Sequence, residues 1–244
     1  MHFDLPTGAR FAAPRILPRR DVSHLDAMLL DEAGRLRVCS AEQLQAVPAE
    51  DLAIWAYLHG VYGFPTAELI EWLAAQRHIG CALSCGDRWR MCSAGVKTIE
   101  IGAGNGAIGR GLGIPCTDSK NMERDDVRLM YAAMGQPTTE YPDDVHRYEA
   151  REAIYTFRPH TVVASWVTQK FKRGIDVVGE AYASVYGVDE EWLVGKVARY
   201  ILIGNEAVHA KKRIMAIPHE THSFPWLVSR AAEQSLNRIW VWQK

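Results

Sequence analysis

The sequence predicts an α/β fold in which a mostly parallel sheet carries helices on both faces and follows an N-terminal helical cap. Apolar runs alternate with helical patterns from Val96 onward, which is typical of a parallel sheet flanked by helices. The first run, residues 96–101, leads into a glycine-rich bend, as such strands do at their C-terminal ends. In the part of the chain before Val96, apolar residues recur at helical spacing instead. We therefore expect an arm and cap over residues 1–94 and a sheet domain over residues 95–244.

The cap is expected to contain three helices after an irregular arm. Residues 1–38 are rich in proline and arginine and show no sustained period. Ser40 precedes a short helical stretch, and Pro48 and Pro65 each open a longer one. The aromatic residues of this section are predicted to pack in a core rather than to contact a ligand: Trp55, Tyr57, Tyr62 and Trp72.

The sheet domain is expected to contain five strands followed by a sixth at the chain end. Apolar runs predict strands at residues 96–101, 114–117, 145–148, 161–166 and 199–204, and the closing NRIWVWQK predicts the last one. Helical patterns precede the later strands at residues 151–157, 189–198 and 226–236.

The bend after the first strand is the main candidate ligand site. Gly102, Gly104 and Gly106 allow backbone N–H groups and the following helix to approach a ligand closely. Asp118, at the tip of the next strand, is positioned to accept both hydroxyls of a ribose. The spacing of Gly104, Gly106 and Gly109 also satisfies the G-x-G-x-x-G pattern of dinucleotide-binding folds. Glycine spacing alone therefore leaves a nucleoside and a dinucleotide open.

The acid ahead of the bend favours a ligand without a diphosphate. Glu100 lies two residues before the first glycine. Its negative charge would be unfavourable beside the phosphates of a dinucleotide and favourable toward a cationic group. We therefore expect a positively charged nucleoside ligand.

The resulting spacing E-x-G-x-G-x-G resembles motif I of the class I S-adenosylmethionine-dependent methyltransferases, a Rossmann-like superfamily. The resemblance covers residues 95–244 in the order of the strands. It implies that S-adenosylmethionine is the cofactor, with its methionine part on the glycines, its ribose on the acid of the second strand, and its adenine beside an acid-alanine pair. The cofactor-binding residues implied by the resemblance are Glu100, Gly102, Gly104, Gly106, Asp118, Glu149, Ala150 and Ser165.

Two departures from the family pattern narrow the expected chemistry. The helix between the bend and the second strand must be about one turn shorter than usual, since only GAIGRGLGIPCTD separates Gly106 from Asp118 inclusive. The fourth strand ends in Ser-Trp-Val, without the D/N-P-P-Y tetrapeptide of amino-methyltransferases and without a following Pro-Cys. Methylation of exocyclic amines in DNA and the covalent cytosine mechanism are therefore not predicted.

Candidates for the transfer site follow the fourth and fifth strands, because acceptors in such sheets lie outside the C-terminal strand ends. Trp166 is a stacking candidate, and Glu206 and His209 are candidate bases. Six basic residues in the loops after these strands would favour an anionic acceptor such as a nucleic acid, a nucleotide or a small metabolite. They are Lys170, Lys172, Arg173, Lys211, Lys212 and Arg213. Two solvated loops are the alternative interpretation of this pattern.

Two other functions compete with methyl transfer. A binding protein that retained a nucleoside pocket without turnover would act through a protein partner. An NAD(P)-dependent oxidoreductase is disfavoured by Glu100 and by the late position of the glycine bend. Fold alone does not separate these activities.

Composition indicates an ordinary globular protein. The net charge of −1 and pI of about 6.8 provide no whole-protein field toward nucleic acid or membrane. A cytoplasmic protein without membrane contact is expected, since no apolar run approaches the roughly 20 residues of a membrane span and MHFDLPTGAR lacks a signal-peptide core. Zinc ligation by Cys81, Cys85 and Cys92 beside His78 is left open, although their spacing matches no paired motif. His219 and His222 with Glu220 are interpreted as a structural turn, so no metal is predicted.

Overall fold

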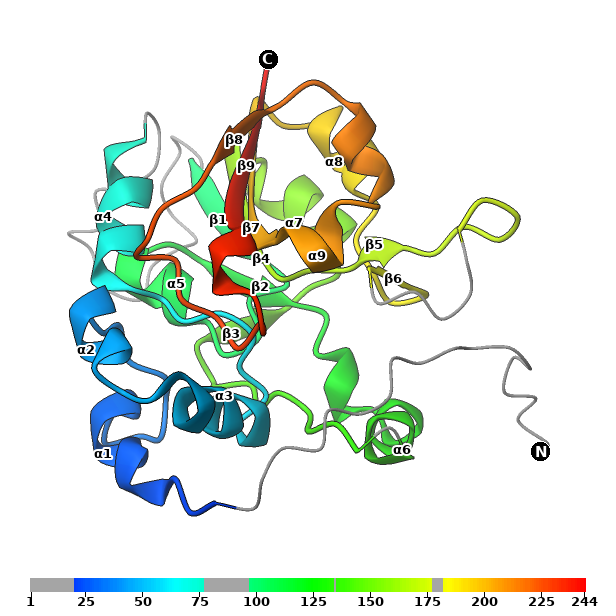
Figure 1. Cartoon of the computed structure of the whole chain (residues 1–244). Helices are drawn as coiled ribbons and strands as arrows, with labels where there is room; N and C mark the ends of the chain where they lie inside the picture. Colours follow the sequence, from blue (N-terminus) through cyan, green and yellow to red (C-terminus); the bar gives the residue numbers. More distant parts are fainter. Residues whose placement is uncertain (1–19, 77–96, 134, 177–181) are drawn as a thin grey trace.

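The computed structural model describes residues 20–76, 97–133, 135–176 and 182–244. A seven-stranded sheet forms its centre, in the order β3-β2-β1-β4-β7-β9-β8 (Figure 1). All pairs from β3 to β7 are parallel, whereas β9 runs antiparallel to both β7 and β8. The prediction of a mostly parallel α/β sheet is confirmed. Its strands are β1 (Thr98–Ile101), β2 (Cys116–Asp118), β3 (Val145–Arg147), β4 (Thr161–Ser165), β7 (Arg199–Asn205), β8 (Glu220–His222) and β9 (Asn237–Gln243).

Helices cover both faces of this sheet (Figure 1). On one face, α7 (Ala150–Phe157) and α8 (Glu190–Val194) pack on apolar side chains of β1, β4 and β7. On the other face, α4 (Ala67–Ala75) and α5 (Ala107–Leu112) pack on alternate residues of β4, β7 and β9. Successive strand residues point to opposite faces, which is why neighbours such as Val162 and Val163 belong to different cores.

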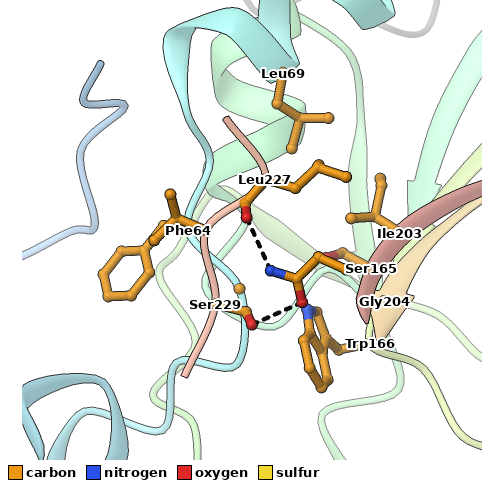
Figure 2. Close-up of a pocket in the computed structure, with 11 residues that line it drawn as sticks. Phe64, Leu69, Ser165, Trp166, Ile203, Gly204, Leu227 and Ser229 are labelled. Atoms are coloured by element: carbon orange, nitrogen blue, oxygen red, sulfur yellow. Dashed lines mark hydrogen bonds between the residues drawn. The ribbon is translucent and has the colours of Figure 1, made fainter. Parts of the chain in front are cut away.

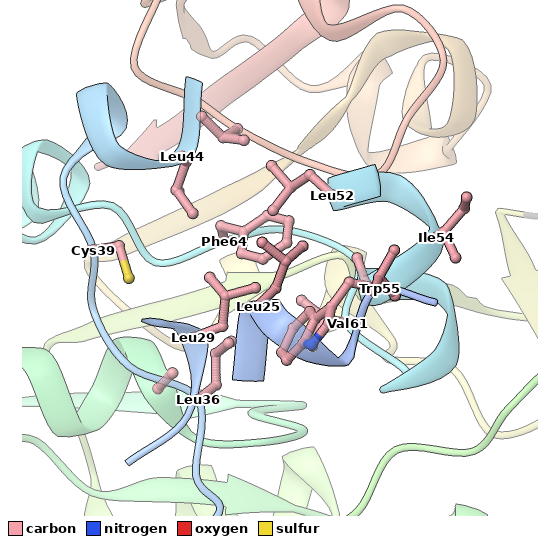
Figure 3. Close-up of a cluster of buried hydrophobic side chains, with 14 residues drawn as sticks. Leu25, Leu29, Leu36, Cys39, Leu44, Leu52, Ile54, Trp55, Val61 and Phe64 are labelled. Carbon is pink, nitrogen blue, oxygen red and sulfur yellow. The ribbon is translucent and has the colours of Figure 1, made fainter. Parts of the chain in front are cut away.

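The remaining N-terminal helices enclose a separate apolar core (Figure 3). They are α1 (Asp26–Leu29), α2 (Ala41–Gln45) and α3 (Ala49–Leu58), preceded by a 3₁₀ turn, η1 (Ser23–Leu25). Ser40 and Gln43 form a capping box at the start of α2, and the Thr66 hydroxyl caps α4. Trp55 is fully buried at the centre of this core, as predicted. Ala107 of α5 and Val228 also belong to it, so this core reaches the sheet domain.

The structure differs from the predicted elements in four places. The arm expected to be irregular over residues 1–38 contains η1 and α1, whose Leu25 and Leu29 are buried. Residues 226–236 are not a helix and contain only the 3₁₀ turn η4 (Gln234–Leu236). Leu227 instead packs in the core between α4 and the sheet, and Val228 packs in the N-terminal core. The Asn237 side chain donates to the Leu227 carbonyl at 2.8 Å. Strand β8 occupies the predicted turn around His219 and His222, and the helix expected over 189–198 ends at Val194 ahead of Gly195.

Several short elements were not predicted and lie around the C-terminal ends of the parallel strands. Between β2 and β3, η2 (Asn121–Glu123) and α6 (Asp125–Ala133) form an excursion beyond that edge (Figure 1). A two-stranded parallel sheet, β5 (Gln169–Lys170) with β6 (Ala183–Ser184), follows β4, and α9 (Glu206–His209) with η3 (Arg213–Ala216) follows β7.

Candidate functional site

The glycine bend joins β1 to α5 in a conformation that requires glycine. Gly102, Gly104 and Gly106 have φ values of 57°, 54° and 70°, the left-handed region that side chains rarely adopt. A Cβ atom at Gly102 would also overlap the Val167 side chain, and one at Gly106 would approach Val145 within 2.7 Å. The bend therefore presents bare backbone at the C-terminal end of β1.

The acid at the end of β2 lies directly against this bend. One carboxylate oxygen of Asp118 accepts from the Gly104 N–H at 3.0 Å, and the other accepts from the Lys120 N–H at 2.8 Å. Burial raises the pKa of Asp118, and these two N–H groups with the Tyr141 side chain act in the opposite direction. The sequence prediction that the bend and this acid share one site agrees with this geometry.

Glu100 lies beneath the bend rather than on its open side. Its side chain is buried, with the residue 1% exposed, and it accepts from the Gly109 N–H of α5 at 2.8 Å. Burial raises its pKa to about 8, and the Gly109 N–H offsets only part of that effect. Its carboxylate is therefore largely protonated near neutral pH. The expected direct attraction between Glu100 and a cationic ligand is not supported by this geometry, so the acid mainly holds the bend onto α5.

The other residues implied to bind the cofactor lie along the same edge of the sheet. Glu149 is exposed and immediately precedes α7, close to Asp118, whose carbonyl accepts from the Tyr148 N–H at 2.9 Å. Ala150 is the first residue of that helix. Ser165 closes β4, two strands away from β2 in the sheet order. The parallel sheet thus assembles these residues from four separate stretches of chain.

Trp166 adopts an unusual backbone conformation just past β4. Its φ of 57° is rare for a bulky residue. The indole packs 6.0 Å from the Tyr62 ring and 5.4 Å from the His209 ring, measured between centroids. Gly63 is required beside it, because a Cβ atom there would lie 2.5 Å from the indole nitrogen. Trp166 and Ser165 border a small cavity with Leu227 and Ser229, with room for about one water molecule (Figure 2).

Both candidate bases are engaged within the protein. His209 is 1% exposed, and burial lowers its pKa to about 3, with nearby Lys212 acting in the same direction. Its Nδ1 lies within hydrogen-bonding distance of the backbone of Asn205. The ring is therefore neutral and held by the protein. Glu206 is exposed and forms an ion pair with Arg238 at 3.0 Å, away from the buried edge.

The two basic loops lie together, but at least half of their charges are engaged within the protein. Lys212 is buried against Glu190, and its amino group donates to the Val167 carbonyl at 3.0 Å. Glu191 accepts from Lys172 and Arg213 at 2.8 Å each, and Asp176 also pairs with Arg213. The exposed members of the six are Lys170, Arg173 and Lys211. The edge of the site is therefore less basic than the six residues predict, because Lys172, Lys212 and Arg213 are paired with acids.

The structure adds residues that the sequence analysis did not identify. Arg230 and Tyr131 lie beside Tyr62, and Tyr141 lies beside Asp118. Arg230 was concealed by the helix expected over 226–236, and the two tyrosines belong to the excursion between β2 and β3. No spacing in the sequence connects these segments, which only the fold brings together.

The described residues contain no group of three histidine, cysteine or acidic side chains arranged to hold a metal ion. Cys81, Cys85, Cys92 and His78 lie outside the described residues. Within the same ranges, no helix has the length and apolar character needed to cross a bilayer.

A comparison with protein-family models and with curated proteins finds no match to this chain.

Proposed function

We propose that this protein binds S-adenosylmethionine and transfers its methyl group to an acceptor that is anionic or planar. The observation that carries the proposal is the contact between the bend and the acid of the next strand, in which the Gly104 N–H donates to Asp118 at 3.0 Å. Bare backbone accommodates the methionine part, and the adjacent carboxylate suits ribose hydroxyls. Each carboxylate oxygen has two lone pairs, so its bond to backbone leaves further acceptor capacity.

The order of the sheet supports this proposal over a dinucleotide enzyme. A dinucleotide-binding sheet has the parallel order 3-2-1-4-5-6. Here the antiparallel β9 is inserted between β7 and β8, so the sheet departs from that parallel order. This support replaces the charge argument from Glu100, whose side chain is buried beneath the bend.

The chemistry proposed here asks the protein mainly for alignment. S-adenosylmethionine supplies a methyl group already activated by a sulfonium, so an in-line acceptor needs proximity and orientation. The acceptor would lie beyond the ends of β4 and β7, where Ser165 and Trp166 are found. His209 and Glu206 are both engaged within the protein and are not placed as general bases. This favours an acceptor whose reacting atom does not have to lose a proton to either residue.

A second candidate is a protein that binds the nucleoside and acts through a partner without turnover. The environments of the two candidate bases favour this second function, because neither His209 nor Glu206 is placed to act as a base in a transfer reaction. Binding and transfer must therefore be measured separately.

Titration calorimetry with S-adenosylmethionine, S-adenosylhomocysteine and NAD tests the cofactor first. We expect binding of the first two and none of NAD; the reverse result supports an oxidoreductase. Transfer of tritiated methyl groups to total RNA, DNA, protein and metabolite pools then tests turnover. Cofactor binding without any labelled product supports the binding protein.

A further inference from the structure

Arg230 is a partly buried cation whose charge has no acidic partner in the described parts of the chain. Its guanidinium carbon lies 3.8 Å from the ring centroid of Tyr62 and 5.6 Å from that of Tyr57. Its Nη1 atom is inaccessible to solvent and, within the described ranges, has no hydrogen-bond partner. The neighbouring basic residues Lys212 and Arg213, by contrast, are paired with acids.

An arginine held in this way is prepared to bind an anion. A guanidinium stays charged at any physiological pH and carries five N–H donors around a flat plane. Stacking on a tyrosine ring engages the faces of that plane and leaves its edge free. A buried donor without a partner is costly, and in native structures it commonly marks a functional position or a bound group.

The aromatic residues around Arg230 form a continuous group at the C-terminal edge of the sheet. Tyr62 contacts Trp166 with 6.0 Å between ring centroids, and the Tyr131 side chain lies beside it. Ser229, which immediately precedes Arg230 in the chain, borders the cavity beside Trp166 (Figure 2). The cation and the rings therefore lie where the proposed reaction requires its acceptor.

We propose that Arg230, Tyr62 and Trp166 form the acceptor site, and that the acceptor is a small planar aromatic molecule carrying a carboxylate or phosphate. Arg230 binds the anionic oxygens through its guanidinium N–H donors, and the rings of Tyr62 and Trp166 contact the planar part. The role as acceptor site rests on the proposed function, whereas binding of the anion does not.

Binding of two matched probe pairs tests the site. The pairs are uridine 5′-monophosphate with uridine, and 4-hydroxybenzoate with 4-hydroxybenzamide, each titrated with and without saturating S-adenosylhomocysteine. We expect the anionic member of at least one pair to bind ten times or more tighter than its neutral partner, as one charge-assisted bond provides. The phosphate and carboxylate arms identify the source of the anion.

Two substitutions separate recognition from folding. Arg230→Met should remove the preference for the anion, and Arg230→Lys should retain part of it. Arg124→Met is the matched control, because Arg124 also lies over a tyrosine ring, that of Tyr186, but is exposed and paired with Asp126. It should leave the preference unchanged. Binding of S-adenosylhomocysteine, within twofold of the unsubstituted protein, shows that each variant is folded.

Equal binding of charged and neutral probes overturns the inference, as does an anion preference that survives Arg230→Met, or no binding of any probe. Failure of S-adenosylhomocysteine to bind the unsubstituted protein counts against the proposed function instead. In that case thermal melting reports folding of the variants, and the titrations without S-adenosylhomocysteine still test Arg230.

Discussion

At the scale of single residues, Glu100 illustrates how burial changes the role of an acid. The carboxyl group lies beneath the glycine bend with the Gly109 N–H as its donor, and its pKa rises from 4.5 to about 8. Between these two pKa values the folded protein binds a proton that the unfolded chain releases. Linkage then requires that this residue's contribution to stability falls as pH rises through that interval.

Glu100→Gln should therefore become relatively more stable as pH rises from 5 to 8. The amide is neutral throughout and its oxygen can still accept from the Gly109 N–H. The difference in unfolding free energy between variant and parent should grow by at most about 4 kcal/mol, since each unit of pKa corresponds to about 1.4 kcal/mol. Urea unfolding at pH 5, 6.5 and 8 measures it. Glu206→Gln, at an exposed acid, is the control substitution; a pH-independent difference for Glu100→Gln would contradict the prediction.

Substitutions of Asp118 and of Tyr141 should affect cofactor binding differently. Asp118→Asn removes the charge and one acceptor oxygen, so binding of S-adenosylmethionine should weaken by tenfold or more. Tyr141→Phe removes a hydroxyl that lies beside the same carboxylate and would compete with a ribose, so binding should not weaken. Calorimetry at one pH compares both with Asp126→Asn, an exposed acid in α6. Equal affinities for Asp118→Asn and the parent would remove Asp118 from the proposed site.

At the scale of elements, the glycine bend needs glycine for two reasons: its backbone has positive φ values, and its packing leaves no room for a side chain. Comparing Gly102 in the bend with Gly34, which lies outside it, separates the two reasons. Gly34 has a φ of 72°, and a Cβ atom added there would meet no heavy atom within 4 Å, so Gly34→Ala should cost about 1 kcal/mol through the backbone alone. Gly102→Ala adds overlap with Val167 and should cost about 1–3 kcal/mol more. Urea denaturation measures both, and cofactor binding should be lost only in Gly102→Ala. Similar costs for the two would mean that the bend adjusts freely.

Local sequence determined some elements well and others poorly, for identifiable reasons. Strands β4 and β7 follow from continuous apolar runs, because both of their faces are covered by helices. The glycine bend and the acid after β2 likewise follow from residue types and order.

The segment 226–236 shows why the remainder could not be predicted. Its helical periodicity is local, but the Asn237 side chain donates to the Leu227 carbonyl and accepts from the Ser229 hydroxyl. Asn237 also accepts from the Asn205 side chain, a contact with a segment distant in sequence. Arg230 meets Tyr62 only because this segment is not helical. The acceptor site proposed above therefore depends on a contact that periodicity does not report.

At the scale of the whole molecule, the N-terminal helices and the sheet should unfold together. Their cores meet at Ala107, which belongs to α5 beside the glycine bend, and at Val228 on the C-terminal edge. Helix α4 also packs directly on the sheet. A ligand on the bend should therefore stabilise the N-terminal helices, although they lie in a different part of the sequence.

Saturating S-adenosylmethionine should raise the opening free energy equally in α3 and β7. At a ligand concentration 100 times Kd, binding to the folded state contributes about 2.7 kcal/mol. Hydrogen exchange of backbone amides in the two elements measures the effect, with NAD as the control ligand. Trp55→Ala, which removes the centre of the N-terminal core, should reduce protection in both elements, because core Trp→Ala changes cost about 3–5 kcal/mol. If the ligand protects β7 and leaves α3 unchanged, the two cores unfold independently, and the N-terminal helices then act as a separate unit resting on the site.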